Sequence, residues 1–402
     1  MNNDEFEFLT TESSLSLVER HIAADPLDLA LKGVDSSICT QIKYLQRARA
    51  KLPHYYNARC IIPSLSYEQS SSSVAAEAKD FSGNICIDLT CGLGADSYSF
   101  SRKFNHVTSI ERDATLCRVA RYNFTRLGAS NINVVNSSAQ EFLESYNGEK
   151  VDMIYIDPAR RDQNKKVFLL EECSPDMNII MPLAMKITER LVVKLSPMFD
   201  VDMAYRFFGA WGAVKVSSVS YERECKEVVV EVSAVQNGNY NCATIIKDET
   251  SVKSYPYKYD PIQTYTTATA NHYEYLYLPN ISFYKSRTIN SLMHQTYNCT
   301  DYCYSSPNAP VLSNTLISNF EGDIYRIEKT TPYKPKELKR ELKQLGSKAK
   351  ILKKDFSEKT EQIKKELAIT DGDAPTLIFT THQNKKTVMF LEAVLKHENT
   401  HM

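Results

Sequence analysis

The sequence predicts an α/β protein with a doubly wound, mostly parallel sheet, a helical region before it and small α+β domains after it. Between residues 76 and 235, short apolar runs alternate with amphipathic helical patterns, which is typical of a parallel sheet covered by helices. One apolar run leads directly into a glycine turn, "IDLTCGLGADSYSF" at 87–100. The chain has 402 residues, enough for roughly two to four domains.

Seven strands are expected in this region, at 84–89, 106–110, 132–135, 151–156, 190–195, 213–220 and 227–235. Helical patterns lie between them, and at 113–127 the apolar residues Leu116, Val119 and Phe124 share one helix face. The last two strands have no helix-length segment between them. We therefore expect them to form an antiparallel pair that closes one edge of the sheet.

The flanking segments differ in character. Residues 1–75 predict helices, one of them capped by Asp25 and ended by Gly33. Residues 236–325 are rich in tyrosine and predict a small β-rich domain. Residues 326–402 predict a compact unit in the order helix, strand, helix, strand, strand. Between Arg326 and Glu366 it carries 14 Lys or Arg against 7 Asp or Glu, a local net charge of +7.

Composition narrows the function classes. The N-terminal "MNNDEFEFLTTES" lacks the basic-then-apolar pattern of a signal peptide, and no run approaches the roughly 18 apolar residues of a membrane span. The ten cysteines are scattered, without the paired spacing of a zinc site. We expect a cytoplasmic protein with reduced thiols, no metal and no membrane partner.

The glycine turn indicates the kind of ligand. A turn of this kind lets a ligand approach the backbone and points N–H groups at it. A dinucleotide fingerprint needs a third glycine three residues after the second, and here that position is Ser97. Asp88, just before the turn, would repel a pyrophosphate and attract an ammonium group. The pattern therefore suits S-adenosylmethionine better than NAD.

Two further motifs follow at successive strand ends. "HVTSIERD" ends in Glu111, 23 residues after Asp88, where an acid accepts both ribose hydroxyls of an adenosine. "VDMIYIDPARRD" then brings Asp157 and Pro158 to the carboxyl edge of the fourth strand, beside the expected ligand crevice. Arg160 and Arg161 follow, and their guanidinium groups suit a phosphate.

Residues 84–235 resemble a class I S-adenosylmethionine-dependent methyltransferase domain, with "DLTCGLG", "SIERD" and "YIDPAR" as its motifs. The whole chain resembles a little-characterised group of bacterial proteins classed as methyltransferases. These carry a ferredoxin-like piece, here 236–325, and a THUMP-like domain, here 326–402. "LPNISFYKSRT" and "LKRELKQLGSKAKILKKDF" carry that wider likeness. The resemblance implies a Rossmann-like sheet of seven strands and S-adenosyl-L-methionine as the cofactor.

The resemblance also implies site residues. Asp88 and the turn 90–94 would hold the methionine end of the cofactor, Glu111 the ribose, and Arg112 would lie beside the adenine. Ser138 stands where the family often has an acid for the adenine amino group, so a weaker contact is expected there. The implied cofactor-binding residues are Gln69, Ser71, Ser72, Asp88, Thr90, Cys91, Gly92, Gly94, Glu111, Arg112, Ser138 and Asp157; the implied catalytic residues are Asp157, Pro158 and Arg160.

The acceptor atom is predicted by elimination. Methylation of a pyrimidine at carbon 5 needs a cysteine nucleophile, yet the fifth strand is followed by Ser196 and Pro197. Cys173 and Cys225 fit packing roles better, so no cysteine is expected to be essential. We favour an exocyclic amine of a base, methylated by positioning and desolvation. The loop "DPAR" lacks the aromatic residue that stacks on the base in amino methyltransferases.

A THUMP-like domain with a basic surface implies structured RNA, either tRNA or rRNA, as the partner, and no DNA. Three alternatives stay open. The basic surface is a solvated face only, or the chain is a catalytically inactive methyltransferase fold that serves as an RNA-binding module, or it methylates a substrate other than RNA.

Overall fold

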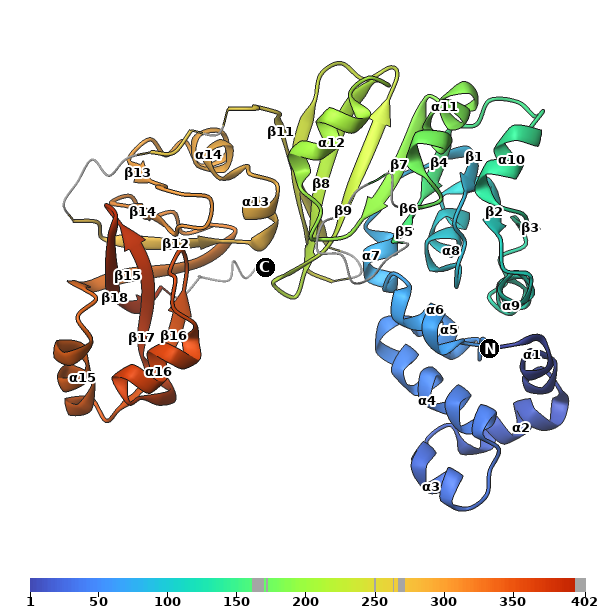
Figure 1. Cartoon of the computed structure of the whole chain (residues 1–402), viewed down its shortest axis with the longest axis horizontal. Coiled ribbons are helices and arrows are strands. Elements are labelled where there is room, and N and C mark those ends of the chain that lie inside the picture. The colour runs from blue at the N-terminus through green and yellow to red at the C-terminus, as the bar shows by residue number, and fades with distance from the viewer. Residues whose placement is uncertain (161–169, 171–172, 249–250, 263, 267–271, 395–402) are drawn as a thin grey trace, which may run out of the picture. The chain divides into compact units, whose positions relative to one another are not determined.

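The computed structural model describes residues 1–160, 170, 173–248, 251–262, 264–266 and 272–394. It divides into two compact units. The N-terminal unit comprises Met1–Tyr240 and Thr244–Ser254, and the C-terminal unit comprises Asn241–Ala243 and Tyr255–Met402. Figure 1 labels their elements. Among the described residues, no helix is both long and apolar enough to cross a membrane.

The N-terminal unit begins with a helical region, as predicted. Asp25 caps its third helix by accepting a hydrogen bond from the Leu27 N–H at 2.8 Å, and Gly33 follows with a φ of +80°. The fourth helix buries Ile38, Ile42 and Leu45 along one face. The helices of this region are α1 (Asn3–Leu9), α2 (Glu12–His21), α3 (Pro26–Leu31), α4 (Ser36–Lys51), α5 (Pro53–Asn57), α6 (Ser64–Gln69) and α7 (Ser73–Glu77).

A nine-stranded sheet forms the core of this unit, in the order β11-β10-β8-β9-β7-β4-β1-β2-β3. The seven strands predicted between residues 76 and 235 are all present. They are β1 (Gly83–Asp88), β2 (Phe104–Glu111), β3 (Ile132–Asn136), β4 (Met153–Ile156), β7 (Arg190–Leu195), β8 (Ala213–Tyr221) and β9 (Glu224–Ser233). β1, β2, β3, β4 and β7 pair in parallel, which confirms the doubly wound class.

One prediction about the sheet is wrong. β8 and β9 are antiparallel, as expected, but they do not close the edge. Two further strands, β10 (Tyr240–Ile246) and β11 (Val252–Lys258), extend the sheet beyond β8. The sequence of β10, "YNCATII", is almost wholly buried, whereas β11 is mostly exposed, as befits an edge strand. The sequence analysis assigns both strands to the tyrosine-rich domain at 236–325, because tyrosines occur in them as well.

Alternate strand residues face opposite sides of the sheet. Ile154 and Ile156 pack in the cluster beneath α10 (Ala139–Ser145), α11 (Met177–Ile187) and α12 (Val201–Phe208). Met153 and Tyr155 pack in another cluster, with Phe100 of α8 (Ala95–Ser101). α9 (Ala114–Arg126) buries Val119 and Phe124, two residues of its predicted apolar face. Both faces of the sheet are therefore covered, and the strand ends are left to form the site.

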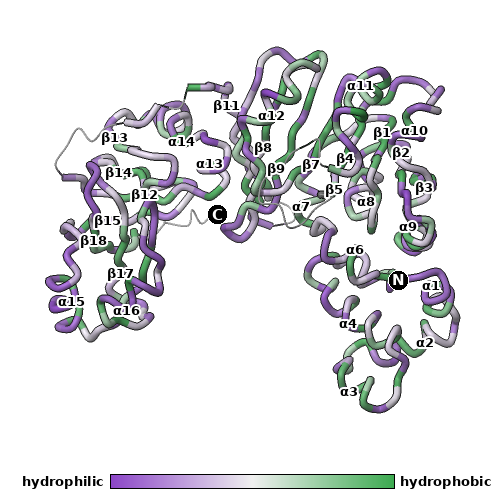
Figure 2. Tube along the Cα trace, viewed as in Figure 1, coloured by the Kyte–Doolittle hydropathy of each residue, from purple (hydrophilic) through white to green (hydrophobic). Residues whose placement is uncertain are grey.

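The C-terminal unit contains a seven-stranded sheet in the order β13-β14-β12-β15-β18-β17-β16. The order predicted for residues 326–402 is present as α15 (Pro335–Gln344), β16 (Lys348–Lys353), α16 (Thr360–Leu367), β17 (Thr370–His382) and β18 (Lys385–Ala393). Figure 2 shows that α15 is mostly hydrophilic. Its apolar residues Leu338 and Leu342 are buried. The remaining elements are β12 (Tyr275–Pro279), α13 (Ile281–Lys285), α14 (Ile289–Ser291), the π-helix η2 (Leu292–Thr296), β13 (Tyr302–Cys303), β14 (Val311–Ser313) and β15 (Gly322–Pro332).

Of the predicted domain boundaries, the one after residue 75 lies within α7, and the one after residue 235 lies between β9 and β10. The boundary after residue 325 lies within β15, which pairs with β12 on one side and with β18 on the other. One sheet therefore draws strands from both of the last two predicted segments. The division into segments 1–75, 76–235, 236–325 and 326–402 stays a prediction.

Candidate functional site

The turn after β1 is organised by the Asp88 carboxylate. Its Oδ1 accepts a hydrogen bond from the Thr90 N–H at 3.0 Å, and its Oδ2 accepts one from the Ser97 hydroxyl at 2.5 Å. The Ser109 hydroxyl donates in turn to Ser97 Oγ at 2.9 Å. Ser97, which occupies the position of the third glycine of a dinucleotide fingerprint, thus holds the carboxylate in place. Asp88 is fully buried beneath the turn that it shapes.

The two glycines of the turn have positive φ angles, +55° for Gly92 and +89° for Gly94. A Cβ at Gly94 would lie 2.5 Å from Cζ of Phe124, so helix α9 packs too closely for any side chain there. A Cβ at Gly92 would meet only the Thr90 carbonyl oxygen, at 4.0 Å, so the space in front of this residue is open. Gly92 therefore leaves room for a ligand beside the backbone, and Gly94 allows the close packing of α9.

Glu111 links this turn to the end of β2. Its Oε2 accepts a hydrogen bond from the Gly92 N–H at 3.0 Å, and its Oε1 accepts one from the Asp113 N–H at 2.9 Å. A carboxylate can accept about four hydrogen bonds, so half of this capacity remains for a ligand. A diol that approached the turn would find acceptors already oriented.

Three other predicted residues have partners that do not depend on a ligand. The Cys91 side chain packs in the core against Phe124, so only its backbone borders the turn. Arg112 Nη1 donates to the Ser174 hydroxyl at 2.9 Å. Ser138 caps α10 in a reciprocal capping box with Glu141. Their roles toward a cofactor stay predictions.

The loop after β4 is tied to the same turn. The Asp157 N–H donates to Thr90 Oγ1 at 2.7 Å. Pro158 is buried, and Ala159 is exposed in the short strand β5 (Ala159–Arg160), which pairs with β6 (Cys173–Ser174). The side chain of Arg160 and the whole of Arg161 lie outside the described residues. Asp157 and Thr90 therefore come together, as the order of the motifs predicts.

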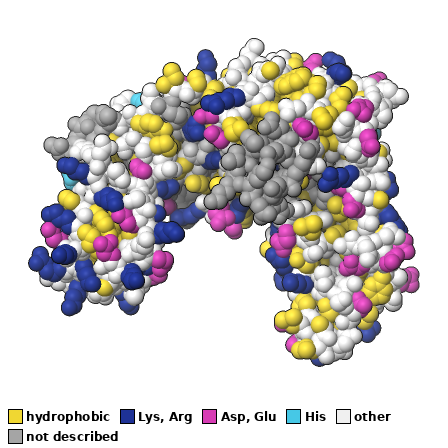
Figure 3. Space-filling model, in the orientation of Figure 1, with side chains coloured by type: hydrophobic (Ala, Val, Ile, Leu, Met, Phe, Trp, Pro, Cys, Tyr) yellow, Lys and Arg dark blue, Asp and Glu magenta, His cyan; other side chains and the backbone are white. Residues whose placement is uncertain are grey.

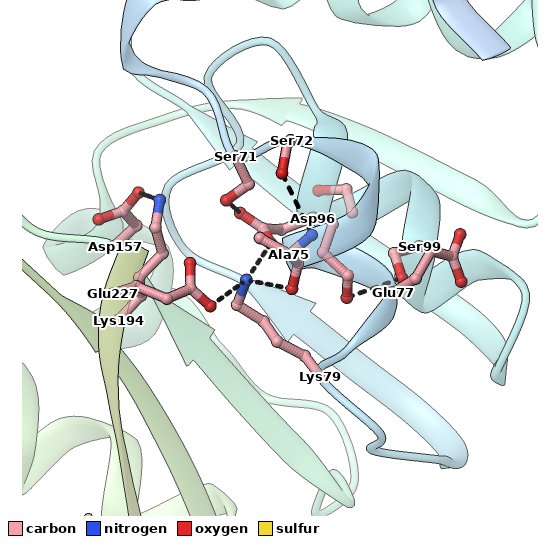
Figure 4. A network of polar contacts seen from close by, with 12 residues as sticks. Ser71, Ser72, Ala75, Glu77, Lys79, Asp96, Ser99, Asp157, Lys194 and Glu227 are labelled. Atoms are coloured by element: carbon pink, nitrogen blue, oxygen red, sulfur yellow. Dashed lines mark hydrogen bonds and ion pairs between the residues drawn. The ribbon is translucent and has the colours of Figure 1, made fainter. Parts of the chain in front are cut away.

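The segment before β1 contributes serines. Gln69 is exposed at the end of α6, and Ser72 caps α7 by accepting a hydrogen bond from the Ala75 N–H at 3.2 Å. The Ser71 hydroxyl donates to Asp96 Oδ2 at 2.8 Å, as Figure 4 shows. Of the three, Ser71 is the one that reaches into α8.

Figure 4 also shows a buried ionic network that the sequence did not reveal. Lys79 Nζ lies 2.9 Å from Asp96 Oδ1 and 2.8 Å from Glu227 Oε1. Lys194 Nζ lies 2.5 Å from Asp157 Oδ2. In the sheet, Ile156 pairs with Val193, so the residues that follow them, Asp157 and Lys194, come side by side. The available signal was charge within an apolar strand, a single lysine in "LVVKL" and the glutamates of "KEVVVEV".

Burial and neighbouring charges set the protonation of these groups. Burial raises the pKa of Asp88 to about 7, although the hydrogen bonds from Ser97 and Thr90 oppose this shift. Burial alone would lower the pKa of Lys79, but the Asp96 and Glu227 carboxylates outweigh it and raise the pKa. The same opposition raises the pKa of Lys194, where the Asp157 carboxylate is the strongest partner. Both lysines therefore stay cationic at neutral pH.

The raised pKa of Asp88 predicts a pH dependence of stability. The pKa of Asp88 is about 7 in the folded state, whereas its ordinary value is 3.8. Protonation of Asp88 therefore contributes to the free energy of unfolding fully below about pH 4, and this contribution is lost as the pH rises through 7. We expect Asp88→Asn to remove this pH-dependent contribution. The wild type should lose stability relative to Asp88→Asn between pH 5 and about 8. Urea unfolding followed by Trp211, the single tryptophan, measures this unit. An equal difference at both pH values would contradict the assignment.

Family models match two parts of the chain. "Conserved hypothetical protein 95" matches residues 73–182, and "THUMP domain-like" matches residues 322–393. A tRNA/tmRNA (uracil-C(5))-methyltransferase of Photorhabdus laumondii is 27% identical over 111 residues, which cover 24% of this chain and 30% of the relative. Ribosomal RNA small subunit methyltransferase J of Alteromonas mediterranea is 28% identical over 131 residues, 29% of this chain and 51% of the relative. The chain thus spans about half or less of the length of these curated relatives.

A solved structure matches the whole fold. The crystal structure of a "putative methyltransferase" from Porphyromonas gingivalis W83 superposes with a TM-score of 0.82 and covers 98% of this chain and 100% of that one, at 23% identity. In this chain the three motifs lie at the ends of β1, β2 and β4, which are neighbours in the sheet. The chain therefore has the fold of that solved structure, and it carries a THUMP domain-like segment at 322–393.

Proposed function

We propose that the chain is an S-adenosylmethionine-dependent methyltransferase that acts on structured RNA. The observation that carries this proposal is the turn at residues 90–94, held between the carboxylates of Asp88 and Glu111. A Cβ-free position at Gly92 with open space in front of it fits a ligand that lies against the backbone. The Thr90 hydroxyl joins this turn to Asp157, so the cofactor turn and the loop after β4 form one site.

S-adenosylmethionine supplies a methyl group on a sulfonium centre. Glu111 has free acceptor capacity for the two ribose hydroxyls, and the turn backbone would face the methionine end, with Asp88 beneath it. Gln69, Ser71, Ser72, Cys91, Arg112 and Ser138 remain secondary candidates for the cofactor. In this proposal Asp157 and Pro158 stand at the methyl acceptor, and Arg160 follows them in the loop.

Glu111→Ala is expected to weaken the binding of S-adenosylhomocysteine by roughly 1 to 3 kcal/mol, because the ribose hydroxyls lose their acceptor. Isothermal calorimetry measures this directly. Glu144→Ala, which removes an exposed carboxylate of α10, is the control and should leave the affinity unchanged. Undetectable binding to the wild type at millimolar ligand would overturn the cofactor assignment.

Two observations support RNA as the substrate. The curated relatives described above are named as methyltransferases of tRNA, tmRNA or ribosomal RNA. In the C-terminal unit, Figure 3 shows Lys and Arg side chains gathered around α15 and α16. Lys353 and Lys354 also line a cavity of about 540 Å³ in this unit, together with Asn308. Clustered cations supply the sequence-independent phosphate contacts on which RNA binding depends.

The acceptor atom is a separate question. Cys173 lies in β6, where it pairs with Arg160 of the loop that carries Asp157, but its side chain is buried in the core. Cys225 lies in β9 at the turn from β8. The burial of Cys173 supports a reaction without this thiol as the nucleophile, and the exocyclic amine is the acceptor that the sequence favours. Mass spectrometry of nucleosides from cells with and without the gene identifies the product. A chain that binds S-adenosylhomocysteine while every RNA nucleoside is unchanged would have a substrate other than RNA.

A further inference from the structure

The pair of Lys194 and Asp157 lies where the acceptor is proposed to bind. Lys194 Nζ is 2.5 Å from Asp157 Oδ2, and the two side chains are 13% and 34% exposed. The lysine is thus mostly covered, while the carboxylate opens toward solvent. Because the Asp157 N–H is bonded to Thr90, this pair borders the cofactor turn. Lys194 belongs to none of the motifs found in the sequence, and the reaction proposed above assigns no role to this lysine.

Other charges hold the Lys194 side chain in place. Asp96 and Glu227 lie near enough to stabilise its positive charge, together with Asp157. Lys79 balances the same two acids from the other side. With three carboxylates around two lysines, a second cation is needed to keep the cluster from carrying a large negative charge. Lys194 is therefore a permanent cation in a fixed position, and it cannot serve as a base.

A fixed cation discriminates between acceptor atoms. When a neutral amine attacks the methyl group, positive charge grows on nitrogen, and a neighbouring lysine opposes it. When a hydroxyl attacks, its proton departs and negative charge grows on oxygen, which a lysine stabilises. Of the first described residues after β4, Pro158 is buried and Ala159 is exposed, and neither carries an aromatic ring.

We infer that the methyl acceptor is a hydroxyl, in RNA the ribose 2′-hydroxyl, in place of the exocyclic amine that the sequence favours, and that Lys194 and Asp157 bind it. The inference rests on the function proposed above. The bond from the methyl carbon to the hydroxyl oxygen forms as the bond from that carbon to the sulfonium sulfur breaks. The hydroxyl proton passes to the open oxygen of Asp157 and then to water. Protonation of Asp157 removes the carboxylate charge that lies closest to Lys194, so the lysine cation then faces the oxygen.

The product tests the acceptor. RNA from cells that lack the gene is methylated with methyl-labelled cofactor and hydrolysed in alkali, which cleaves only next to a free 2′-hydroxyl. We expect the label in alkali-resistant dinucleotides. Label in mononucleotides would overturn the inference and preserve RNA methylation. No label in any RNA would overturn the proposed RNA function along with it, so the two failures are distinguishable.

Variants test Lys194 itself. Lys194→Met should lower kcat by about 100-fold or more, the usual cost of removing one group that stabilises an oxyanion. Its KM for RNA and its calorimetric affinity for S-adenosylhomocysteine should change by less than about threefold. Lys194→Arg should recover part of kcat, because the charge returns. The matched control is Lys215→Met on β8, whose Nζ is 3.9 Å from Glu231 Oε2. A Lys194→Met enzyme with wild-type kcat would overturn the role, as would one that loses cofactor binding in step with kcat.

Discussion

Replacing Lys79 with methionine is expected to lower the free energy of unfolding of the N-terminal unit by about 3 to 5 kcal/mol, the usual cost of removing one partner of a buried ion pair. Its ammonium nitrogen lies 2.9 Å from Asp96 Oδ1 and 2.8 Å from Glu227 Oε1, and it donates a hydrogen bond to the Ala75 carbonyl oxygen at 3.1 Å. The lysine side chain is 2% exposed, so water cannot replace it. Two carboxylates would be left buried and facing each other. Urea unfolding followed by Trp211 measures the loss.

A second substitution, which neutralises one of the two acids, distinguishes the repulsion between unpaired carboxylates from the loss of packing. In the Lys79→Met background, Glu227→Gln should restore part of the stability, because one of the two opposed charges is gone. Lys215→Met is the control for losing a half-exposed ion pair, and it should cost less than about 1 kcal/mol. If Lys79→Met unfolds within about 1 kcal/mol of the wild type, the cluster does not hold these elements together.

The sheet was predictable because its signals are local. Each strand of the parallel core is a short apolar run followed by a helical pattern, and "IDLTCGLG" marks the first strand end without any knowledge of the fold. β11 was missed for the opposite reason. It is an exposed edge strand, so its residues alternate weakly and resemble a loop. Where a strand lies at the edge, pairing rather than sequence pattern decides its structure.

The site residues likewise divide into those that the sequence predicted and those that it did not. Asp88, Glu111 and Asp157 were found because each ends a strand, and parallel strands end at a common edge. Lys79, Asp96, Lys194 and Glu227 were missed, because their meeting depends on strand register and on the path of the segment before β1. A lone lysine in "LVVKL" reads as a solvated side chain until the neighbouring strand supplies Asp157. Tertiary pairing gives it a function that local sequence does not show.

The structure also changes which basic residues test RNA binding. The basic segment between Arg326 and Glu366 includes Lys339, Arg340, Lys343, Lys353 and Lys354. Lys354 differs from the others, because its Nζ lies 3.9 Å from the ring centroid of Tyr284 and burial lowers its pKa. Its reversal would disrupt packing as well as charge. The other four side chains are exposed, so their reversal changes mainly charge, although Lys353 Nζ also donates a hydrogen bond to the Glu358 carbonyl oxygen at 3.0 Å.

Reversing Lys339, Arg340, Lys343 and Lys353 to glutamate is expected to abolish RNA methylation at physiological salt. Each neutralised phosphate releases counterions, so a protein with about five phosphate contacts loses roughly two to three orders of magnitude in affinity between 50 and 200 mM salt. Removing four cations should flatten the slope of log affinity against log salt by about 3 to 4. Binding titrations with fluorescent RNA at several salt concentrations measure that slope.

A matched variant distinguishes RNA binding at the basic face of α15 and β16 from an effect of the overall net charge. Arg20, Lys32, Lys150 and Lys186 are exposed on the N-terminal unit, and reversing them changes the net charge by the same −8, from four changes of −2 each. If the α15 and β16 face binds RNA, this second set should keep most of the slope. Affinity for S-adenosylhomocysteine should be unchanged in both variants, because neither alters the turn or Glu111. Equal slopes in the two variants would show that only net charge matters. An unchanged slope in the first variant would leave the basic face a solvated surface, because phosphates bound there must release counterions when its cations are lost.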